Sequence, residues 1–444
     1  METIVQVAQL LLALSILVGI HEAGHMLTAR MFGMKVEKFF IGFPPTLFSF
    51  KKGETEYGLG AIPLGGFVKI SGMIDESMDK EQMAQPPQPW EFRSKPAWQR
   101  LIVMLGGIIV NVIAGVLAMI ILTYNVGDVY IPKADIAQHG IEALKYGKEF
   151  GFQTGDKILD INGEDYERFS DATKPSNFLN DGTYYTVLRD GERIKIELPS
   201  DALRTMSSNE DFMDNFIMPR IPFVVDYPED ETYRANSGAY NAGILKGDLI
   251  LSVADQPAQY RDQMRTAIAP YAGQTVSVKV ERSGESFEFD VPVAKDTTIG
   301  ISMVSTLVGA RKDYGFGESV KKGTNQAFSM VILNAKAMGK MFTGGISARS
   351  LSGPIGILAM YPKTWDWNAF WYTTGFISMI LAFMNLLPIP ALDGGHVVFL
   401  LYEMVSGSAP SDKFLEGAQK VGMVILLALM VFVFGNDILK LFGI

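Results

Sequence analysis

Three stretches of the chain contain no Asp, Glu, Lys or Arg and approach or exceed the length of a membrane-crossing helix. They run from Thr3 to Ile20, from Leu101 to Gly127 and from Asn368 to Leu392. A span takes about 20 apolar residues, so each stretch predicts a transmembrane helix. A fourth stretch, Val421 to Asn436, is shorter, but Lys420 can snorkel and the residues before it can extend the helix. We therefore predict a multi-pass α-helical membrane protein with four transmembrane helices.

The first stretch could also be a cleaved signal peptide. Met1 and Glu2 supply no basic region, however, and no small-residue cleavage pattern follows the apolar run, which favours a retained helix. Basic residues near the spans predict the orientation. They follow the first span and precede the second: Arg30, Lys35, Lys38, Lys51, Lys52, Arg93, Lys95 and Arg100. The segment between these two spans is therefore expected on the cytoplasmic side, and the long region from Asp128 to Asp366 outside it.

The long outer region contains an internal repeat. The segment Gly151–Gly163 recurs as Gly243–Asp255, each with a Gly-Asp turn followed by a short apolar strand and a second turn. This pattern predicts two mixed β domains in tandem, and it resembles PDZ domains. Because PDZ domains take extended peptides against a sheet edge, the resemblance implies a peptide-screening role. The alternative is a pair of spacers without a ligand.

The first apolar stretch ends in the pattern His21-Glu22-Ala23-Gly24-His25. On a helix His21 and His25 share a face and can bind one metal ion, while Glu22 handles a proton. A catalytic zinc site needs a third protein ligand and one open position, and the chain has no cysteine to supply a thiolate. The end of the third stretch offers Asp393, in the segment Asn385–Gly395, at a similar predicted depth. Prolines in that segment predict a broken helix that lines a wet cavity.

These two motifs together resemble the site-2 protease family of intramembrane zinc metalloproteases. The family motifs are His-Glu-x-x-His on one span and Asn-x-x-Pro-x-Pro-x-Leu-Asp-Gly on another. The two PDZ-like domains narrow the resemblance to the bacterial sigma-E-regulating branch, and the segments Tyr57–Gly72 and Ser352–Ile357 agree with it as well. The resemblance implies hydrolysis of peptide bonds within transmembrane segments of pre-trimmed, single-pass membrane proteins. Its implied substrates are an anti-sigma factor and remnant signal peptides. It also implies a place in the bacterial inner membrane, with periplasmic PDZ domains and the active site near the cytoplasmic face.

The resemblance assigns roles to individual residues. His21, His25 and Asp393 would hold Zn²⁺, and Glu22 would be the general base. Asn385 would anchor substrate or stabilise the oxyanion, with a hydrogen bond between helices as the alternative.

Three further polar residues have simpler interpretations. His396 could compete as a ligand, but a supporting or packing role suffices for it. His139 is interpreted as a surface residue. Asn111 lies one turn after Gly106-Gly107, where small residues allow close helix contact, and is expected to form an interhelical hydrogen bond.

The segment between the first two spans predicts a membrane-associated β-hairpin around the Lys51–Glu54 turn. We expect its residues Gly58, Leu59, Gly60, Ala61 and Ile62 to form an edge strand to which substrate is added, the alternative being a hairpin that only braces the helices. Farther along, Phe316–Phe342 predicts an amphipathic helix that lies on the membrane surface or packs on the second PDZ-like domain.

The predicted organisation has nine parts. The four transmembrane helices are 1–31, 98–125, 366–400 and 419–444. The remaining parts are the hairpin segment 32–97, the PDZ-like domains 126–220 and 221–306, the helical linker 307–365 and the cytoplasmic loop 401–418.

Two other functions are alternatives to the protease. A catalytically inactive membrane-anchored PDZ scaffold gives no reason for Glu22 beside two histidines, and a zinc transporter would need polar groups along several spans. The net charge of −9 argues against a nucleic-acid partner, whereas membrane lipid is an expected one.

Overall fold

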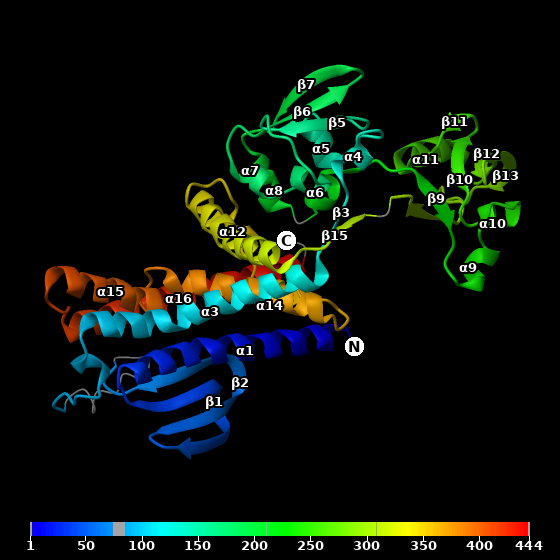
Figure 1. Ribbon diagram of the computed structural model, residues 1–444. Helices are drawn as coiled ribbons and strands as arrows, with labels where there is room; N and C mark the ends of the chain where they lie inside the picture. The colour runs from blue at the N-terminus through cyan, green and yellow to red at the C-terminus, as the bar shows by residue number, and fades with distance from the viewer. Residues whose placement is uncertain (1, 74–84, 210, 308, 443–444) are drawn as a thin grey trace. The chain divides into compact units, whose positions relative to one another are not determined.

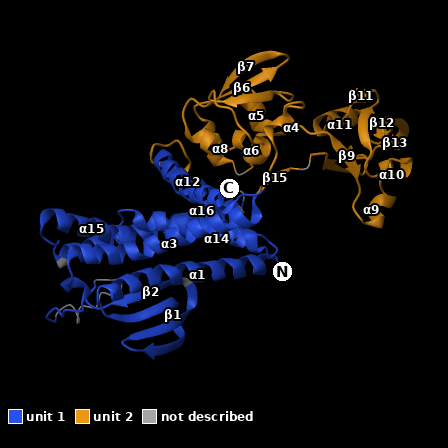
Figure 2. Ribbon diagram, viewed as in Figure 1, with its two compact units in different colours: residues 1–127, 313–341, 348–444 blue, residues 128–312, 342–347 orange. Residues whose placement is uncertain are grey.

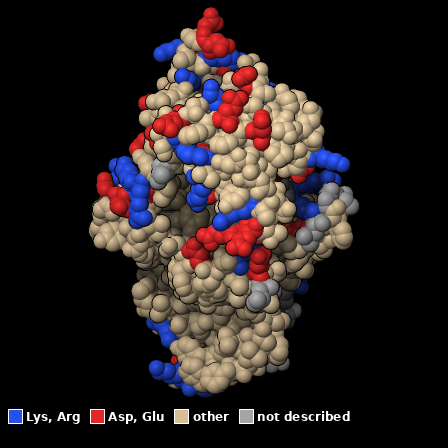
Figure 3. All heavy atoms as spheres, turned by 90° about the vertical axis from the view of Figure 1, so that its right-hand side faces the viewer, with Lys and Arg blue, Asp and Glu red and all other residues tan. Residues whose placement is uncertain are grey.

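The computed structural model describes residues 2–73, 85–209, 211–307 and 309–442. They fall into two compact units, shown in different colours in Figure 2. Unit 1 comprises residues 1–127, 313–341 and 348–444, and unit 2 comprises residues 128–312 and 342–347. Figure 3 shows acidic and basic side chains spread over the surface of unit 2, whereas much of the visible surface of unit 1 is uncharged.

Four helices of unit 1 are long and apolar enough to cross a membrane, in agreement with the four predicted spans. They are α1 (Glu2–Met31), α3 (Ala97–Val126), α14 (Trp367–Leu386) and α16 (Asp412–Leu441). The fourth begins several residues before the predicted boundary at 419. The predicted third span is divided, because α14 ends at Leu386 and a separate helix, α15 (Asp393–Ser406), begins at Asp393. The prolines at positions 388 and 390 explain this break, since they remove backbone donors.

Helix α3 is the centre of unit 1, in contact with α1, α14 and α15 (Figure 1). Against α1 the contact is backbone to backbone. A Cβ atom added to Gly24 would lie 2.3 Å from the carbonyl oxygen of Gly106, and one added to Gly106 would lie 2.6 Å from that of Gly24. The small residues therefore allow the two helices to approach at the level of the His-Glu-x-x-His motif.

The amphipathic helix α12 (Phe316–Phe342) packs within unit 1. Its Ala327 is fully buried against Met119 of α3 and Met379 of α14. Two shorter helices of this unit are the 3₁₀ helix η4 (Ala348–Ser350) and α13 (Pro354–Ala359). The α13 end is fixed to α16, because the buried Asp437 carboxylate accepts backbone N–H bonds from Gly353 and Ile355, both at 2.9 Å.

The segment between the first two spans forms an antiparallel pair of long strands, β1 (Val36–Lys52) and β2 (Thr55–Ile70). Both strands bend midway, so that the pair contains four strand segments in the spatial order 66–70, 36–41, 56–60 and 46–52. The sheet lies along α1 (Figure 1). Arg30 at the end of α1 donates to Thr55 at 2.8 Å and to Tyr57 at 2.7 Å, which joins the helix to the hairpin. The short 3₁₀ helix η1 (Phe92–Ser94) leads from this region into α3.

The outermost strand segment of this hairpin, 46–52, exposes large apolar side chains. Leu47, Phe48 and Phe50 are each at least half exposed on the segment farthest from strand segment 66–70. An exposed group of large apolar side chains marks an interaction surface, and membrane association of this segment stays a prediction.

Unit 2 contains two β-rich halves. The first half has the three-stranded sheet β5-β6-β7 and two small strand pairs, and the second half has the six-stranded sheet β13-β12-β10-β9-β14 with β11 beside β10. The elements of the first half are β3 (Asp128–Tyr130), α4 (Lys133–Ile136), β4 (Ile141–Ala143), α5 (Lys145–Glu149), β5 (Lys157–Ile161), α6 (Phe169–Ala172), α7 (Ser176–Leu179), β6 (Tyr184–Arg189), β7 (Glu192–Glu197), α8 (Ala202–Ser208), η2 (Met213–Asn215) and β8 (Ile217–Pro219). Those of the second half are β9 (Phe223–Asp226), α9 (Glu231–Ala235), α10 (Gly238–Ala242), β10 (Leu249–Val253), β11 (Gln256–Pro257), α11 (Arg261–Ile268), η3 (Ala269–Tyr271), β12 (Thr275–Arg282), β13 (Glu285–Pro292), β14 (Ser302–Ser305) and β15 (Ala310–Lys312), the last paired with β3.

The internal repeat has a structural counterpart in the two halves. Asp156, with no exposed side-chain surface, accepts two hydrogen bonds of 2.7 Å from Arg189. At the corresponding place Asp248 accepts two bonds of 2.7 Å from Arg282. Each aspartate also accepts a backbone N–H three residues before it. The Gly-Asp turn of the sequence therefore marks the same bidentate, buried carboxylate–guanidinium pair in each half.

Candidate metal centre

His21, His25 and Asp393 come together from opposite ends of the sequence. Asp393 Oδ2 lies 3.2 Å from His21 Nε2 and 3.3 Å from His25 Nε2, and the two imidazole nitrogens are 3.2 Å apart. The carboxylate comes from the first residue of α15, and both imidazoles come from α1. Within the described residues, these three form the group of side chains whose geometry could hold a metal ion.

The triangle of donor atoms fits zinc. Tetrahedral Zn²⁺ with bonds of about 2.0–2.2 Å separates its ligand atoms by about 3.3–3.6 Å, close to the distances between these three atoms. Asp393 Oδ2 is buried and faces the two imidazole nitrogens without forming a hydrogen bond of good geometry. Two neutral imidazoles and a carboxylate also match the donor types that zinc takes in catalytic sites. The residues present therefore fit the ion that the sequence predicts.

Helix α3 contacts the second nitrogen of each imidazole. His25 Nδ1 lies 2.8 Å from the backbone carbonyl oxygen of Val103, and His21 Nδ1 lies 3.2 Å from Asn111 Nδ2. Gly107 lies between them on the same face of α3. A Cβ atom added to Gly107 would be 2.5 Å from His25 Nε2 and 2.6 Å from His21 Cε1. The predicted interhelical hydrogen bond of Asn111 is thus made to His21.

Glu22 and Asn385 lie beside the same centre. Glu22 lines a cavity of about 430 Å³ together with His21, His25 and Asp393. It also lines a smaller cavity of about 230 Å³, which includes Asn385. The Nδ2 atom of Asn385 is 3.5 Å from His21 Nε2. Both side chains are therefore within reach of a group held between the imidazoles and Asp393.

The strand segment 66–70 forms the edge of the sheet nearest the centre. Gly66, Phe67 and Val68 line the larger cavity, and the backbone of Val68 lies within reach of the Glu22 carboxylate. The register places the predicted edge residues elsewhere. Gly58 pairs with Phe40 on one side and Ser49 on the other.

Leu59 likewise has partners on both sides, Ile41 and Phe48, so this part of the predicted edge Gly58–Ile62 lies inside the sheet. The bends in β1 and β2 are the physical reason, since they fold each long strand into two segments and place 56–60 in the interior.

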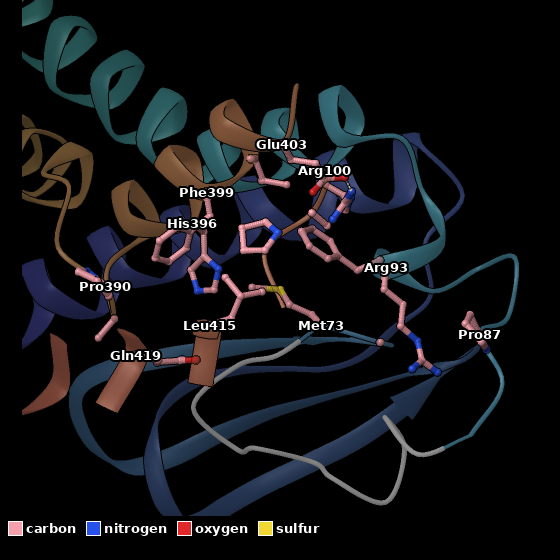
Figure 4. A pocket seen from close by; sticks show the side chains of 16 residues that line it. Met73, Pro87, Arg93, Arg100, Pro390, His396, Phe399, Glu403, Leu415 and Gln419 are labelled. Atoms are coloured by element: carbon pink, nitrogen blue, oxygen red, sulfur yellow. Dashed lines mark hydrogen bonds and ion pairs between the residues drawn. The ribbon is translucent and has the colours of Figure 1, made fainter. Parts of the chain in front are cut away.

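A third cavity, of about 410 Å³, adjoins the 430 Å³ cavity beside the metal centre (Figure 4). The two cavities share Met73, Ala391, His396 and Gln419 in their walls. Figure 4 shows the side chains of His396 and Gln419 directed into this space, and the ion pair of Arg100 with Glu403 in its wall. The wall of this cavity therefore combines apolar side chains with polar and charged ones.

Gln419 reaches this wall because α16 approaches the loop before Asp393 very closely. A Cβ atom added to Gly422 would lie 1.5 Å from the carbonyl oxygen of Pro390. No motif in the sequence indicates Gln419 or Gly422. Only the spacing of three between Gln419 and Gly422, which puts both on one helix face, relates them to this contact.

The two remaining histidines lie outside the group of three. His396 lines the larger cavity but is not among the residues whose donor atoms converge. His139 is half-buried in unit 2, with Nδ1 2.8 Å from the hydroxyl of Tyr260. It therefore has a specific partner, unlike the simple surface residue that we predict.

Comparison with known proteins gives matches along nearly the whole chain. A profile of peptidase family M50 matches residues 9–429. The chain is 31% identical to a putative zinc metalloprotease of Pasteurella multocida, covering 98% of both chains. It is 29% identical to the regulator of sigma E protease of Haemophilus influenzae, over 97% of this chain and 98% of that one. It is 26% identical to the zinc metalloprotease RasP of Geobacillus kaustophilus, over 99% of both chains.

Proposed function

Because this chain belongs to peptidase family M50 and is a zinc metalloprotease, we propose that His21, His25 and Asp393 hold its catalytic zinc and that Glu22 is its general base. The observation that carries the proposal is the triangle of donor atoms, with sides of 3.2, 3.2 and 3.3 Å, beside the Glu22 cavity. Four apolar helices and the similarity to sigma-E-regulating proteases make it an inner-membrane enzyme that acts within the membrane.

The proposed chemistry divides among the residues of the site. Bound Zn²⁺ supplies Lewis-acid chemistry that polarises a peptide carbonyl and acidifies water. Glu22 takes the proton of the attacking water and passes it to the leaving nitrogen. Asn385, whose amide faces the same centre, donates to the substrate carbonyl oxygen as negative charge develops there. The 410 Å³ cavity, whose wall includes His396, Gln419 and the Arg100–Glu403 ion pair, gives water a route to the site.

A transmembrane substrate hides its peptide bonds in its own helical hydrogen bonds, so it must be unwound before cleavage. We assign this step to strand segment 66–70, whose outer edge borders the cavity that holds Glu22. An extended substrate segment added to this edge exchanges helical hydrogen bonds for strand hydrogen bonds. Its backbone then passes directly beside the proposed base.

The substrates proposed are single-pass membrane proteins that have already lost their bulky outer domains. An anti-sigma factor is the leading candidate, because relatives over nearly the full length are named as regulators of sigma E. Remnant signal peptides are a second class. The two halves of unit 2 act as PDZ domains that exclude untrimmed proteins, on the basis of the repeated turn and its conserved Asp–Arg geometry. In this arrangement they face the periplasm, and the metal centre is near the cytoplasmic face.

The test is metal analysis combined with cleavage of a model transmembrane substrate by the purified full-length protein. Asp393→Ala is expected to lose zinc and activity together. Glu22→Gln is expected to retain zinc and lose activity, whereas Glu54→Gln, on the exposed hairpin turn, should behave as wild type. A Glu22→Gln protein that still cleaves would overturn the proposed mechanism. If the protein is instead a catalytically inactive PDZ scaffold, neither the wild type nor any of the three variants will cleave the substrate.

A further inference from the structure

Three residues of α3, spaced four apart in sequence, lie on the helix face that contacts the metal centre. They are Val103, Gly107 and Asn111. Gly107 lies against both imidazoles, and the residues on either side contact one imidazole each. This arrangement raises the question of what Val103 and Asn111 do for the two histidines.

The contact at Val103 determines the tautomer of His25. A backbone carbonyl oxygen can only accept a hydrogen bond, so the 2.8 Å contact requires the proton on His25 Nδ1. The lone pair of neutral His25 is then on Nε2, the atom that faces Asp393. The backbone of α3 thus prepares this imidazole to bind a metal ion.

At Asn111, the amide nitrogen Nδ2 lies 3.2 Å from the corresponding ring nitrogen of the other histidine, His21 Nδ1. The amide NH₂ group faces the ring there, while Oδ1 is buried without a hydrogen-bond partner. A 180° rotation of the amide group exchanges its oxygen and its nitrogen, which are nearly indistinguishable in position and size. It then gives the unpartnered oxygen a donor in His21 Nδ1–H, and it leaves the Nε2 lone pair directed at Asp393.

We propose that Asn111 is a positioning residue for the metal centre, whose side-chain oxygen accepts the Nδ1 proton of His21 and holds this imidazole in its metal-binding tautomer. This inference rests on the proposed function, because it takes His21 as a zinc ligand. It extends that function to a residue on a different helix. Asn111 is well placed for the task, since it is 1% exposed and its own backbone carbonyl is held by Ser378 of α14 at 2.8 Å.

Partners of this type raise the basicity of a ligating imidazole and orient its ring. Their loss typically lowers metal affinity about 10–100-fold. A hydrogen bond that only joins two helices would have another signature, since its loss weakens helix association without changing metal affinity. Metal affinity therefore separates the two roles of Asn111.

The experiment measures zinc affinity by competition with a chelator, and the visible spectrum of the cobalt-substituted protein, for the full-length protein in detergent. Asn111→Leu keeps the side-chain size but has no acceptor, and we expect it to bind zinc about 10–100-fold more weakly. Asn111→Asp keeps an acceptor and has no donor, so it should stay within a few-fold of wild type. Thr374→Val removes a buried hydroxyl elsewhere in the bundle and should leave zinc affinity unchanged.

Two results would overturn the proposal: wild-type zinc affinity in Asn111→Leu, or a loss of zinc affinity of about 10-fold or more in Asn111→Asp. The second result keeps the test decisive even where the leucine variant fails to fold. His21→Ala, measured in parallel, tests the proposed function separately. If that variant binds zinc like the wild type, the ligand assignment fails, whatever Asn111 does.

Discussion

Gly24 and Gly106 bring α1 and α3 into direct backbone contact at the level of the metal centre. Gly24 is the fourth residue of the His-Glu-x-x-His motif, so the contact lies between the two histidines in sequence. No larger residue fits at either position without moving a helix backbone. The distance between α1 and α3, and with it the position of both imidazoles relative to α3, is thus determined by glycine.

Gly107→Ala should weaken zinc binding. The added carbon would lie about 2.5 Å from both imidazole rings, which must move, and overpacking of this kind costs about 1–3 kcal/mol. Alanine is the better helix former, so a loss of zinc would not reflect a weaker helix. Zinc content after dialysis measures the effect. Gly317→Ala, on α12 with no atom within 4 Å of the added carbon, is the control, and equal zinc content in the two variants would contradict the prediction.

Gly422→Ala should reduce cleavage of a model substrate severely. The methyl carbon would lie 1.5 Å from the carbonyl oxygen of Pro390, so α16 must withdraw from the loop that precedes Asp393. Initial cleavage rates in detergent measure the effect. Gly435→Ala, on the same helix with no atom within 4 Å, should cleave at the wild-type rate. Equal rates for the two variants would show that this contact has no role in activity.

Strand addition can be tested by cross-linking, because the chain has no cysteine of its own. Val68→Cys, in a Glu22→Gln background, should form a disulfide with a cysteine placed near the scissile bond of the substrate. Val68 lines the cavity that contains Glu22. Ser49→Cys, on the opposite outer segment of the same sheet, should form little, and the reverse preference would refute the assignment of segment 66–70.

Deletion of residues 128–306 should allow cleavage of an untrimmed substrate. The proposed exclusion of bulky outer domains requires the two halves of unit 2, whereas the proposed metal ligands and base all belong to unit 1. Cleavage of a pre-trimmed substrate should therefore continue. The same deletion with Glu22→Gln controls for other proteases. Continued protection of the untrimmed substrate would mean that unit 2 does not select substrates by size.

The motifs and the family resemblance predict that His21, His25 and Asp393 come together, and in the structure their donor atoms do; their role as metal ligands stays a prediction. His21 and His25 share a helix face by spacing alone, and the prolines before Asp393 predicted the helix break that turns its carboxylate toward them. Asn111 and Val103 were not recognised as contacts of the imidazoles. Their spacing shows that they share a face of α3, but it does not say which helix that face meets.

The edge strand was the other point at which sequence was insufficient. Alternation of apolar residues predicts strands, yet it does not give their order in a sheet, and the bends of β1 and β2 make four segments from two strands. Glycines at positions 58 and 60 suggested close approach by a substrate. In the structure the neighbours that approach are the segments 36–41 and 46–52 of the same hairpin.

The distance in sequence between the histidines and Asp393 has a consequence for biosynthesis. The histidines leave the ribosome first, whereas the carboxylate leaves only when almost all of the polypeptide has been made. Until then the growing chain contains the two imidazoles without the Asp393 carboxylate. On the proposed ligand assignment, the zinc site is therefore completed only after α1, α3 and α14 have been synthesised.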